Sequence, residues 1–323
     1  MKITDKTEYL AQHVHEQLGK VIVGMDDIIH GLIIAWVAQG HVLLEGVPGL
    51  GKTLLAKALA QLINSHFGRI QGTADLMPSD MTGIHIYNNE KHTFEFAPGP
   101  LFNRVVLVDE INRTGPKTQS ALLQAMEENA VTLDRKTYPL PKDFFLLAAQ
   151  NPYEFEGVYP LLESQLDRFL VKLNLTYPDA ATEALILSRY DKPGGGHQAA
   201  LQSITPLAEH DLILAREQTA AVHVDESLYR YVVMLAAASR QHPQLSLGLS
   251  TRGALALIRC ARVEAALASR DYVLPDDIKR VAPLVISHRL LLTSEALLAG
   301  YTALHVYQEL VNQVAIPDIS NDA

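Results

Sequence analysis

The stretch His41-Val42-Leu43-Leu44-Glu45-Gly46-Val47-Pro48-Gly49-Leu50-Gly51-Lys52-Thr53 places an apolar run directly before a glycine-rich loop. Residues 42–44 predict a strand, and residues 54–63 predict a helix. Glycines at such a junction let successive backbone N–H groups converge on phosphate oxygens, and the helix adds the positive end of its dipole. An ordinary glycine turn is the alternative, which the flanking strand and helix make the weaker interpretation. The stretch therefore predicts binding of a nucleoside triphosphate.

The loop assigns a role to each kind of residue that it contains. We expect Lys52 to reach the β- and γ-phosphates of ATP or ADP, and Thr53 to place its hydroxyl on Mg²⁺. The predicted nucleotide-binding residues are Gly46, Val47, Pro48, Gly49, Leu50, Gly51, Lys52, Thr53 and Leu54.

A second stretch supplies the acids that such a site needs. Residues 105–108 read Val-Val-Leu-Val, which is typical of a strand buried on both faces, and Asp109 and Glu110 follow. Asp109 is predicted to hold Mg²⁺, directly or through water, and Glu110 to orient and deprotonate the attacking water. Acids at the start of a helix are the alternative. The glycine loop makes that alternative the weaker one.

These two motifs resemble Walker A and Walker B of the AAA+ ATPases, and further segments resemble the MoxR branch of that group. The resemblance covers most of the chain. It implies an α/β fold: a P-loop AAA+ core with a parallel sheet flanked by helices, followed by an all-helical C-terminal lid. The residues that carry it are Gly46-Val47-Pro48-Gly49-Leu50-Gly51-Lys52-Thr53, Asp109-Glu110-Ile111-Asn112-Arg113, Pro116-Lys117-Thr118-Gln119-Ser120-Ala121-Leu122-Leu123, Ala149-Gln150-Asn151-Pro152 and Gln165-Leu166-Asp167-Arg168-Phe169.

The resemblance implies catalytic roles for three more residues, beside Glu110. Asn151 follows the apolar run 144–149 and resembles sensor 1, although Asn-Pro is also a turn signal. Arg168 resembles the arginine finger that a neighbouring subunit inserts; a surface ion pair with Asp167 or Glu163 is the alternative. Arg252 resembles sensor 2, with Thr251 where the family more often has proline.

Arg113 stays open between two roles. It could face the phosphate across a subunit boundary, or it could brace the turn after residues 105–108.

The order of the patterns predicts two domains. Strand-like runs at 42–44, 105–108, 144–149 and 169–175 alternate with helical ones up to residue 178, as in a mainly parallel sheet with helices on both faces. After that point the patterns are helical, at 225–239, 251–269, 275–282 and 294–314. We therefore expect a nucleotide-binding core at 1–178 and a helical lid at 179–323, with a glycine-rich break at 193–196.

Two insertions resemble those of the MoxR, magnesium chelatase and minichromosome-maintenance group. The first lies between residues 75 and 101, with short alternating segments at 84–87 and 92–96. The second follows a predicted helix at 116–128, and its residues 131–140 predict two strands around a polar turn. The resemblance places such hairpins at a pore or a substrate, and ordinary solvated β-turns are the alternative.

Composition narrows the choice of partners and compartment. The chain has 27 basic and 36 acidic residues and a net charge of −9, which argues against nucleic acid as a partner. The single Cys260 excludes an internal disulfide. The longest apolar region, 28–44, is interrupted by polar residues and glycine, so no membrane span is predicted. The N-terminal residues lack an apolar signal-peptide region, and we expect a cytoplasmic protein.

The resemblance implies a hexameric ATPase that remodels or matures an unknown protein client, often by metal-cofactor insertion, with a von Willebrand factor A domain protein as partner. One alternative is a DNA motor or loader that grips DNA through Arg135 and Lys136. Another is a nucleotide switch that does not hydrolyse ATP. Glu110, Asn151, Arg168 and Arg252 together favour hydrolysis.

Overall fold

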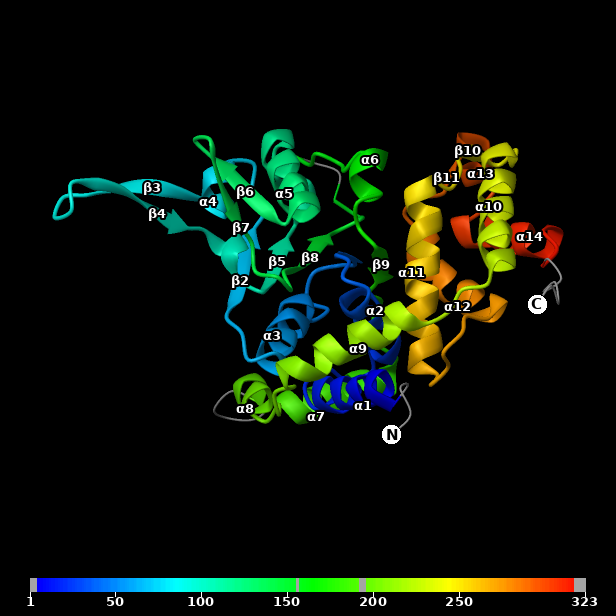
Figure 1. The fold of residues 1–323 in the computed structure, drawn as a ribbon, viewed down its shortest axis with the longest axis horizontal. Coiled ribbons are helices and arrows are strands. Elements are labelled where there is room, and N and C mark those ends of the chain that lie inside the picture. The colour runs from blue at the N-terminus through cyan, green and yellow to red at the C-terminus, as the bar shows by residue number, and fades with distance from the viewer. Residues whose placement is uncertain (1–4, 155–156, 192–195, 317–323) are drawn as a thin grey trace.

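The computed structural model describes residues 5–154, 157–191 and 196–316. Its centre is a five-stranded parallel sheet in the order β2-β5-β8-β1-β9 (Figure 1). The strands are β1 (Val42–Glu45), β2 (Phe67–Gln71), β5 (Val105–Asp109), β8 (Phe145–Gln150) and β9 (Val171–Asn174). Four of them were predicted from apolar runs. The fifth, β2, is an edge strand that the sequence did not reveal.

The parallel register brings three strand ends together at one edge of the sheet. Glu45 at the end of β1 lies opposite Gln150 at the end of β8, and Val108 of β5 lies opposite Ala148 of β8. The loops that follow these strands therefore meet at the carboxyl edge, which is where ligands bind in open α/β sheets.

Helices cover both faces of the sheet, as predicted. Leu44 belongs to a core with α1 (Asp5–Gly19), α2 (Asp26–Val37) and α3 (Lys52–Leu62). Its neighbour Leu43 belongs to a second core, with α4 (Pro78–Thr82) and α5 (Pro116–Glu128). Both leucines are fully buried, and each such side chain stabilises the fold by about 1.5–3 kcal/mol.

Three helices after residue 178 lie beside the sheet domain. They are α7 (Ala180–Tyr190), α8 (Gly196–Gln202) and α9 (Glu209–Ala221), and they lie next to α1 and α3 in Figure 1. The Leu207 N–H donates to the Leu62 carbonyl at the end of α3 (2.7 Å). The domain boundary at 178/179 stays a prediction. In the structure, these three helices pack beside the sheet domain. Of the predicted break at 193–196, residues 193–195 lie outside the described residues, and Gly196 begins α8.

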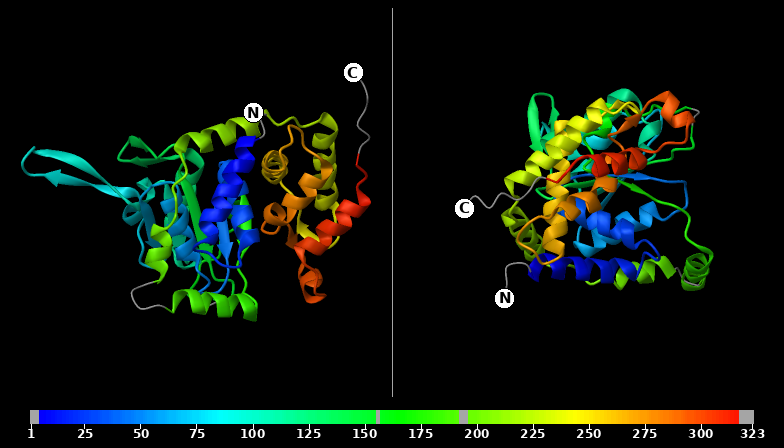
Figure 2. Two further views of the ribbon diagram at one scale, coloured as in Figure 1. Left: turned by 90° about the horizontal axis from the view of Figure 1, so that it is seen from below. Right: turned by 90° about the vertical axis from the view of Figure 1, so that its right-hand side faces the viewer.

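The remaining helices form a separate layer at the right of Figure 1, seen from two further sides in Figure 2. They are α10 (Glu226–Gln241), α11 (Thr251–Leu267), α12 (Pro275–Ile286), α13 (Ser294–Leu298) and α14 (Ala303–Gln313). The region is helical as predicted, with one addition, the small sheet of β10 (Leu245–Leu247) and β11 (Leu291–Leu292). The helical pattern at 294–314 is divided, because Gly300 adopts a φ of +82° between α13 and α14.

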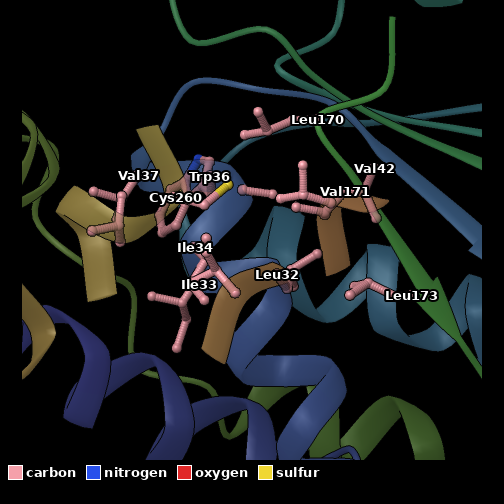
Figure 3. Packing of buried hydrophobic residues seen from close by; sticks show 14 of the residues in the cluster. Leu32, Ile33, Ile34, Trp36, Val37, Val42, Leu170, Val171, Leu173 and Cys260 are labelled. Carbon is pink, nitrogen blue, oxygen red and sulfur yellow. The ribbon is translucent and has the colours of Figure 1, made fainter. Parts of the chain in front are cut away.

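This helical layer packs directly on the sheet domain through α2. Figure 3 shows Cys260 of α11 against Trp36 of α2, near Val171 of β9 and Leu170 just before that strand. Glu264 of α11 is only 3% exposed and accepts from His30 of α2 at 2.9 Å. Burial raises the pKa of Glu264, but hydrogen bonds from His30 and Arg280 outweigh it and leave that pKa lowered. The two domains thus share one core.

Both predicted hairpins are present. One consists of β3 (Gly83–Asn88) and β4 (Thr93–Pro98) and projects far from the body of the protein (Figures 1 and 2). The other consists of β6 (Ala130–Leu133) and β7 (Lys136–Pro139). They touch at the base, where Phe96 stacks on Tyr138 with ring centroids 4.0 Å apart. His85 also contacts Asp134 at 3.1 Å and the Tyr138 hydroxyl at 2.9 Å.

Burial explains the chemical character of the single cysteine. Cys260 is enclosed in the shared core, and desolvation raises the pKa of its thiol to about 12, so it is not a reactive thiolate. Among the residues that the structure describes, no helix combines the length and the apolar character needed to cross a membrane.

Candidate functional site

A cavity of about 860 Å³ opens at the carboxyl edge of the sheet. It gathers most of the predicted nucleotide and metal residues with the two predicted catalytic residues Glu110 and Asn151. Its lining also includes residues that were not predicted, from α3 and α8. The lining residues are Pro48, Gly49, Gly51, Lys52, Thr53, Leu54, Lys57, Gln61, Asp109, Glu110, Asn151, His197, Gln198, Leu201 and Gln202.

The loop between β1 and α3 has the shape that phosphate binding requires. Gly49 and Gly51 have φ values of +86° and +81°, which other residues adopt only with strain. A Cβ at either position would meet no atom within 4 Å, so backbone conformation, not crowding, selects glycine there. Helix α3 begins directly after Gly51, at Lys52, and its first N–H groups are free to face an anion.

Lys52 is buried at the base of this loop. Its side chain is 8% exposed, and its Nζ donates to the Gly46 carbonyl at 2.7 Å. Burial lowers the pKa of Lys52, while Asp109, Glu110 and Glu154 act to raise it. A phosphate would supply counter-charge to an ammonium that the protein has already desolvated.

Asp109 and Thr53 are suited to hold a magnesium ion whose remaining ligands would come from a bound nucleotide and from water. Asp109 ends β5 and contacts Arg69 of β2 at 3.4 Å, and Thr53 lies in the first turn of α3. Among the described residues, no cluster of three or more His, Cys, Asp or Glu side chains is suited to a metal by itself. Mg²⁺ commonly takes one or two protein ligands together with phosphate and water oxygens, so the donor set is compatible.

Glu110 has a strained backbone. Its φ and ψ are 55° and 49°, in the left-handed region that side chains other than glycine adopt at a cost. Its carboxylate accepts from Gln71 Nε2 at 3.0 Å and lies 3.4 Å from Arg113 Nε. Gly72 follows β2, and a Cβ at this position would lie 2.1 Å from the Glu110 carbonyl oxygen. Glycine at 72 therefore allows the ends of β2 and β5 to lie this close together.

Asn151 is connected to Arg113 through Glu154. Arg113 donates from Nε and Nη2 to the two Glu154 oxygens, each at 3.0 Å. Hydrogen bonding to Arg113 is the main cause that lowers the pKa of Glu154, and Asn151 contributes to it. Asn151 Oδ1 accepts from the Tyr153 N–H at 3.2 Å. Of the two roles left open for Arg113, these contacts favour bracing the turn after β5.

Arg168 and Arg252 lie elsewhere, and they lie together. Arg168 follows α6 (Glu163–Leu166), and Arg252 is in the first turn of α11. Both form ion pairs with Glu127 near the end of α5, Arg168 at 3.1 Å and Arg252 at 2.6 Å. Neither lines the cavity described above. The ion pair of Arg168 is with Glu127, not with Asp167 or Glu163 as the alternative had it.

The two arginines face a second cavity, of about 510 Å³. Several cationic side chains contribute to its wall, from α9, α11 and the loop after α12. They outnumber the acids there, which are Glu127, Asp143 and Asp167. The cationic residues are Lys142, Arg168, Arg216, Arg252, Arg259 and Arg289.

Some residues at these sites were not predicted. Gln71 and Arg69 belong to the unpredicted strand β2, and α8 follows the glycine-rich break. Lys57 and Gln61 could have been inferred, since they follow Thr53 at intervals of four along one helix face. The role of Glu127 could not be predicted from the sequence, because its partners Arg168 and Arg252 lie 41 and 125 residues further along the chain.

The sheet, the phosphate loop and the acidic end of β5 define an ATPase domain of the AAA+ type with a helical lid. Residues 41–171 match the "ATPase family associated with various cellular activities (AAA)", and residues 237–310 match the "AAA lid domain". Chaperone MoxR1 of Mycobacterium tuberculosis is 37% identical over 334 residues, which cover 97% of this chain and 85% of that protein. The chain belongs to the MoxR family of AAA+ ATPases.

Two further relatives extend this likeness. YeaC of Bacillus subtilis is 46% identical over 303 residues, 94% of this chain and 93% of that protein. The crystal structure of a proposed ATPase from Cytophaga hutchinsonii superposes with a TM-score of 0.88 at 39% identity, covering 97% of this chain and 98% of that one. Family membership implies a nucleotide with a divalent metal. The predicted fold class is confirmed.

Proposed function

We propose that this protein hydrolyses ATP at a site shared by neighbouring copies and couples the cycle to chaperone-like remodelling of a protein client. One observation carries the shared site. Arg168 and Arg252 lie side by side on Glu127, outside the cavity that holds Lys52, Asp109 and Glu110. The predicted arginines and the predicted hydrolytic residues of one chain therefore line two separate cavities.

Within one chain, the cavity supports binding and water activation. Lys52 and the N–H groups of the loop bind the β- and γ-phosphates. The apolar side chain of Leu201 in α8 offers a surface for the adenine ring of ATP. Glu110, held by Gln71, accepts a proton from the attacking water, and Asn151 orients that water. Mg²⁺ bound at Thr53 and Asp109 would neutralise charge on the phosphates.

The neighbouring chain supplies the rest of the charge. Arg168 and Arg252 reach the γ-phosphate of the adjacent copy, and that phosphate replaces Glu127 as their partner. The exchange is feasible, because the two arginine side chains are 33% and 48% exposed and their ion pairs with Glu127 are weakly stabilising. A closed ring of such contacts, with six copies as the resemblance implies, would give every site its arginines.

The chaperone role comes to this chain from the name of its relative MoxR1. A von Willebrand factor A domain partner, metal-cofactor insertion as the outcome, and a cytoplasmic location remain predictions. The projecting β3–β4 hairpin, with Phe94 71% exposed, is a candidate contact for the client.

Complementation between two inactive variants tests the shared site. Glu110→Gln should bind ATP without turnover, and Arg168→Ala should bind ATP without activating its neighbour. Mixed in equal amounts before assembly, they should regain about a quarter of the wild-type rate, because that fraction of interfaces pairs an intact Glu110 with an intact Arg168.

Three results would oppose this proposal. Full activity of Arg168→Ala alone would remove the arginine from the reaction, and a mixture that stays inactive at every ratio would contradict the shared site. Absence of turnover in the assembled wild type, with ATP bound, would favour the nucleotide switch. Arg230→Ala is the matched control, because Arg230 is also an exposed arginine paired to a glutamate, Glu226 at 2.8 Å, but lines neither cavity, so its loss should leave turnover unchanged.

A further inference from the structure

Arg289 is a buried arginine that neither the motifs nor the proposed chemistry uses. It follows α12 in the lid, and its side chain is only 3% exposed. Four of its hydrogen bonds reach one short segment, residues 167–170, and a fifth returns to its own helix. The acceptors are Asp167 Oδ1 at 2.7 Å, Asp167 O at 3.2 Å, Phe169 O at 2.5 Å, Leu170 O at 3.0 Å and Val285 O at 2.6 Å.

The burial of this charge needs an explanation beyond packing. Desolvation lowers the pKa of Arg289, and Asp167 opposes that effect. A buried ion pair is seldom more stabilising than apolar side chains of similar volume, so packing alone does not require arginine here. What arginine adds is a rigid fork of donors that fixes several acceptors at once. The segment fixed in this way carries Arg168.

Two more lid side chains hold the same segment. Ser250 Oγ donates to Asp167 Oδ2 at 2.9 Å and accepts from the Gly253 N–H at 2.9 Å as the N-cap of α11. His288 contacts the Phe169 carbonyl through Nε2 at 3.1 Å. Asp167 therefore joins the loop of Arg168 to the helix start that carries Arg252.

The first turn of α11 also packs closely on Arg289. A Cβ added to Gly253, the residue after Arg252, would lie 2.9 Å from Arg289 Cδ. The Arg289 side chain thus contacts both elements. Its guanidinium donates to the loop that carries Arg168, and its aliphatic part packs against the start of α11.

We propose that Arg289 is a positioning residue that holds Arg168 and Arg252 as one unit for the neighbouring active site. The inference rests on the proposed function, since it assumes that these arginines act across the interface. Arg289 does not line the 860 Å³ cavity, so its loss should spare the chain's own nucleotide binding and impair catalysis in the adjacent copy.

Arg289→Met tests the proposal in the full-length protein. We expect kcat of the assembled variant to fall about 10²-fold, because small displacements of catalytic groups have effects of that size, while KM for ATP changes by less than about threefold. Mixing Arg289→Met with Glu110→Gln should restore activity to about a quarter of wild type. A variant that was merely unstable would lose its own site as well, and would restore nothing.

Arg270→Met is the matched control. Arg270 is another lid arginine paired to a buried carboxylate, Asp277, at 2.8 and 2.5 Å. Its partners named here lie within the lid, so its replacement should cost stability and leave kcat within about twofold of wild type. A fall in kcat equal to that of Arg289→Met would assign the effect to general loosening of the lid and overturn the proposal.

A second variant covers the case in which Arg289→Met does not fold. Asp167→Asn keeps the shape of the acceptor, which is 21% exposed, but removes its charge. It should show the same complementation with Glu110→Gln after a smaller loss of kcat. Two outcomes would overturn the role of Arg289 and leave the shared site intact. One is wild-type kcat in Asp167→Asn. The other is that neither Arg289→Met nor Asp167→Asn complements Glu110→Gln although Arg168→Ala does. Failure of Arg168→Ala to complement would overturn the shared site itself.

Discussion

At the scale of single residues, the backbone of Glu110 carries a cost that its position explains. The residue follows β5 with φ 55°, and the turn directs its carboxylate toward Gln71 and the cavity. A left-handed conformation costs a residue with a Cβ about 1–2 kcal/mol. Strain of this kind persists where surrounding contacts hold it, and such contacts here come from β2.

Comparing Glu110→Ala with Glu110→Gly isolates that cost. Both variants lose the carboxylate, so both should lack turnover, and they differ only in the Cβ. We expect Glu110→Gly to be more stable by about 1 kcal/mol, because glycine adopts the left-handed region without strain. Urea denaturation of the two variants measures the difference. Equal stability would show that the backbone at 110 is not strained.

His41 provides a residue-scale prediction about pH. It precedes β1, its Nδ1 accepts from the Leu146 N–H at 3.2 Å, and its Nε2 contacts the Met126 carbonyl at 3.3 Å. Burial lowers the pKa of His41 from 6.5 to about 4. Between these values the unfolded chain binds a proton that the folded chain does not, so stability falls as the pH falls through this window, by about 3 kcal/mol in total.

His41→Gln should remove this contribution. The amide keeps polar contacts in the same place and does not titrate, so between pH 6.5 and 4 the stability of the variant should decline less steeply, by up to about 1.4 kcal/mol per pH unit. Buried His288, whose pKa is also lowered, remains in both proteins and gives the same background. Chemical denaturation at a series of pH values measures the slopes. Parallel curves for variant and wild type would contradict the assignment.

At the scale of elements, the sequence predicted those strands and helices whose own side chains are buried. Strands β5 and β8 are apolar runs with both faces covered, and α5 begins at Pro116 and ends at Glu128 as predicted. Strand β2 reads Phe-Gly-Arg-Ile-Gln, and its alternate residues Arg69 and Gln71 are exposed at the sheet edge. Such an edge strand is defined by its partner β5 more than by its own composition.

The same limit applies to the site. Lys52, Asp109, Glu110 and Asn151 were predictable, because each lies at or after the end of a recognisable strand, and the structure brings them to one cavity. The grouping of Arg168 with Arg252 was not predictable, because it depends on Glu127 and Arg289 through contacts that span 41 to 125 residues. Local pattern predicts where a side chain is in its element, whereas pairing across elements follows from tertiary packing.

The β3–β4 hairpin yields an element-scale prediction about apolar side chains. Phe94 is 71% exposed near the end of the hairpin, whereas Phe96, two residues along the same strand, stacks on Tyr138. Phe94→Ser should change the unfolding free energy by less than about 0.5 kcal/mol, and Phe96→Ser should lower it by about 1–2 kcal/mol. Denaturant unfolding of both variants tests the contrast. A comparable loss in Phe94→Ser would mean that its side chain packs within the chain.

At the scale of the whole molecule, charge and shape bear on the partner. The net charge of −9 disfavours a polyanion, and the cationic cavity at Arg168 and Arg252 is small and lined by acids as well. Arg135 and Lys136, the pair that a DNA motor would use, are exposed in the β6–β7 hairpin, where Lys136 lies over the Tyr138 ring at 4.9 Å. Two such cations neutralise few phosphates of a DNA duplex and therefore support only weak DNA binding.

We therefore expect the ATP-bound Glu110→Gln variant to retain a protein client and to bind DNA only weakly. Fluorescence anisotropy with single- and double-stranded DNA at about 50 and 200 mM salt measures the second point, since each neutralised phosphate makes affinity fall with salt. A pull-down with and without ATP measures the first, with Lys52→Ala as the control that lacks nucleotide. Tight, salt-dependent DNA binding that is lost in Arg135→Glu/Lys136→Glu would reverse the conclusion, because two exposed cations on a hairpin would then outweigh the charge of the entire chain.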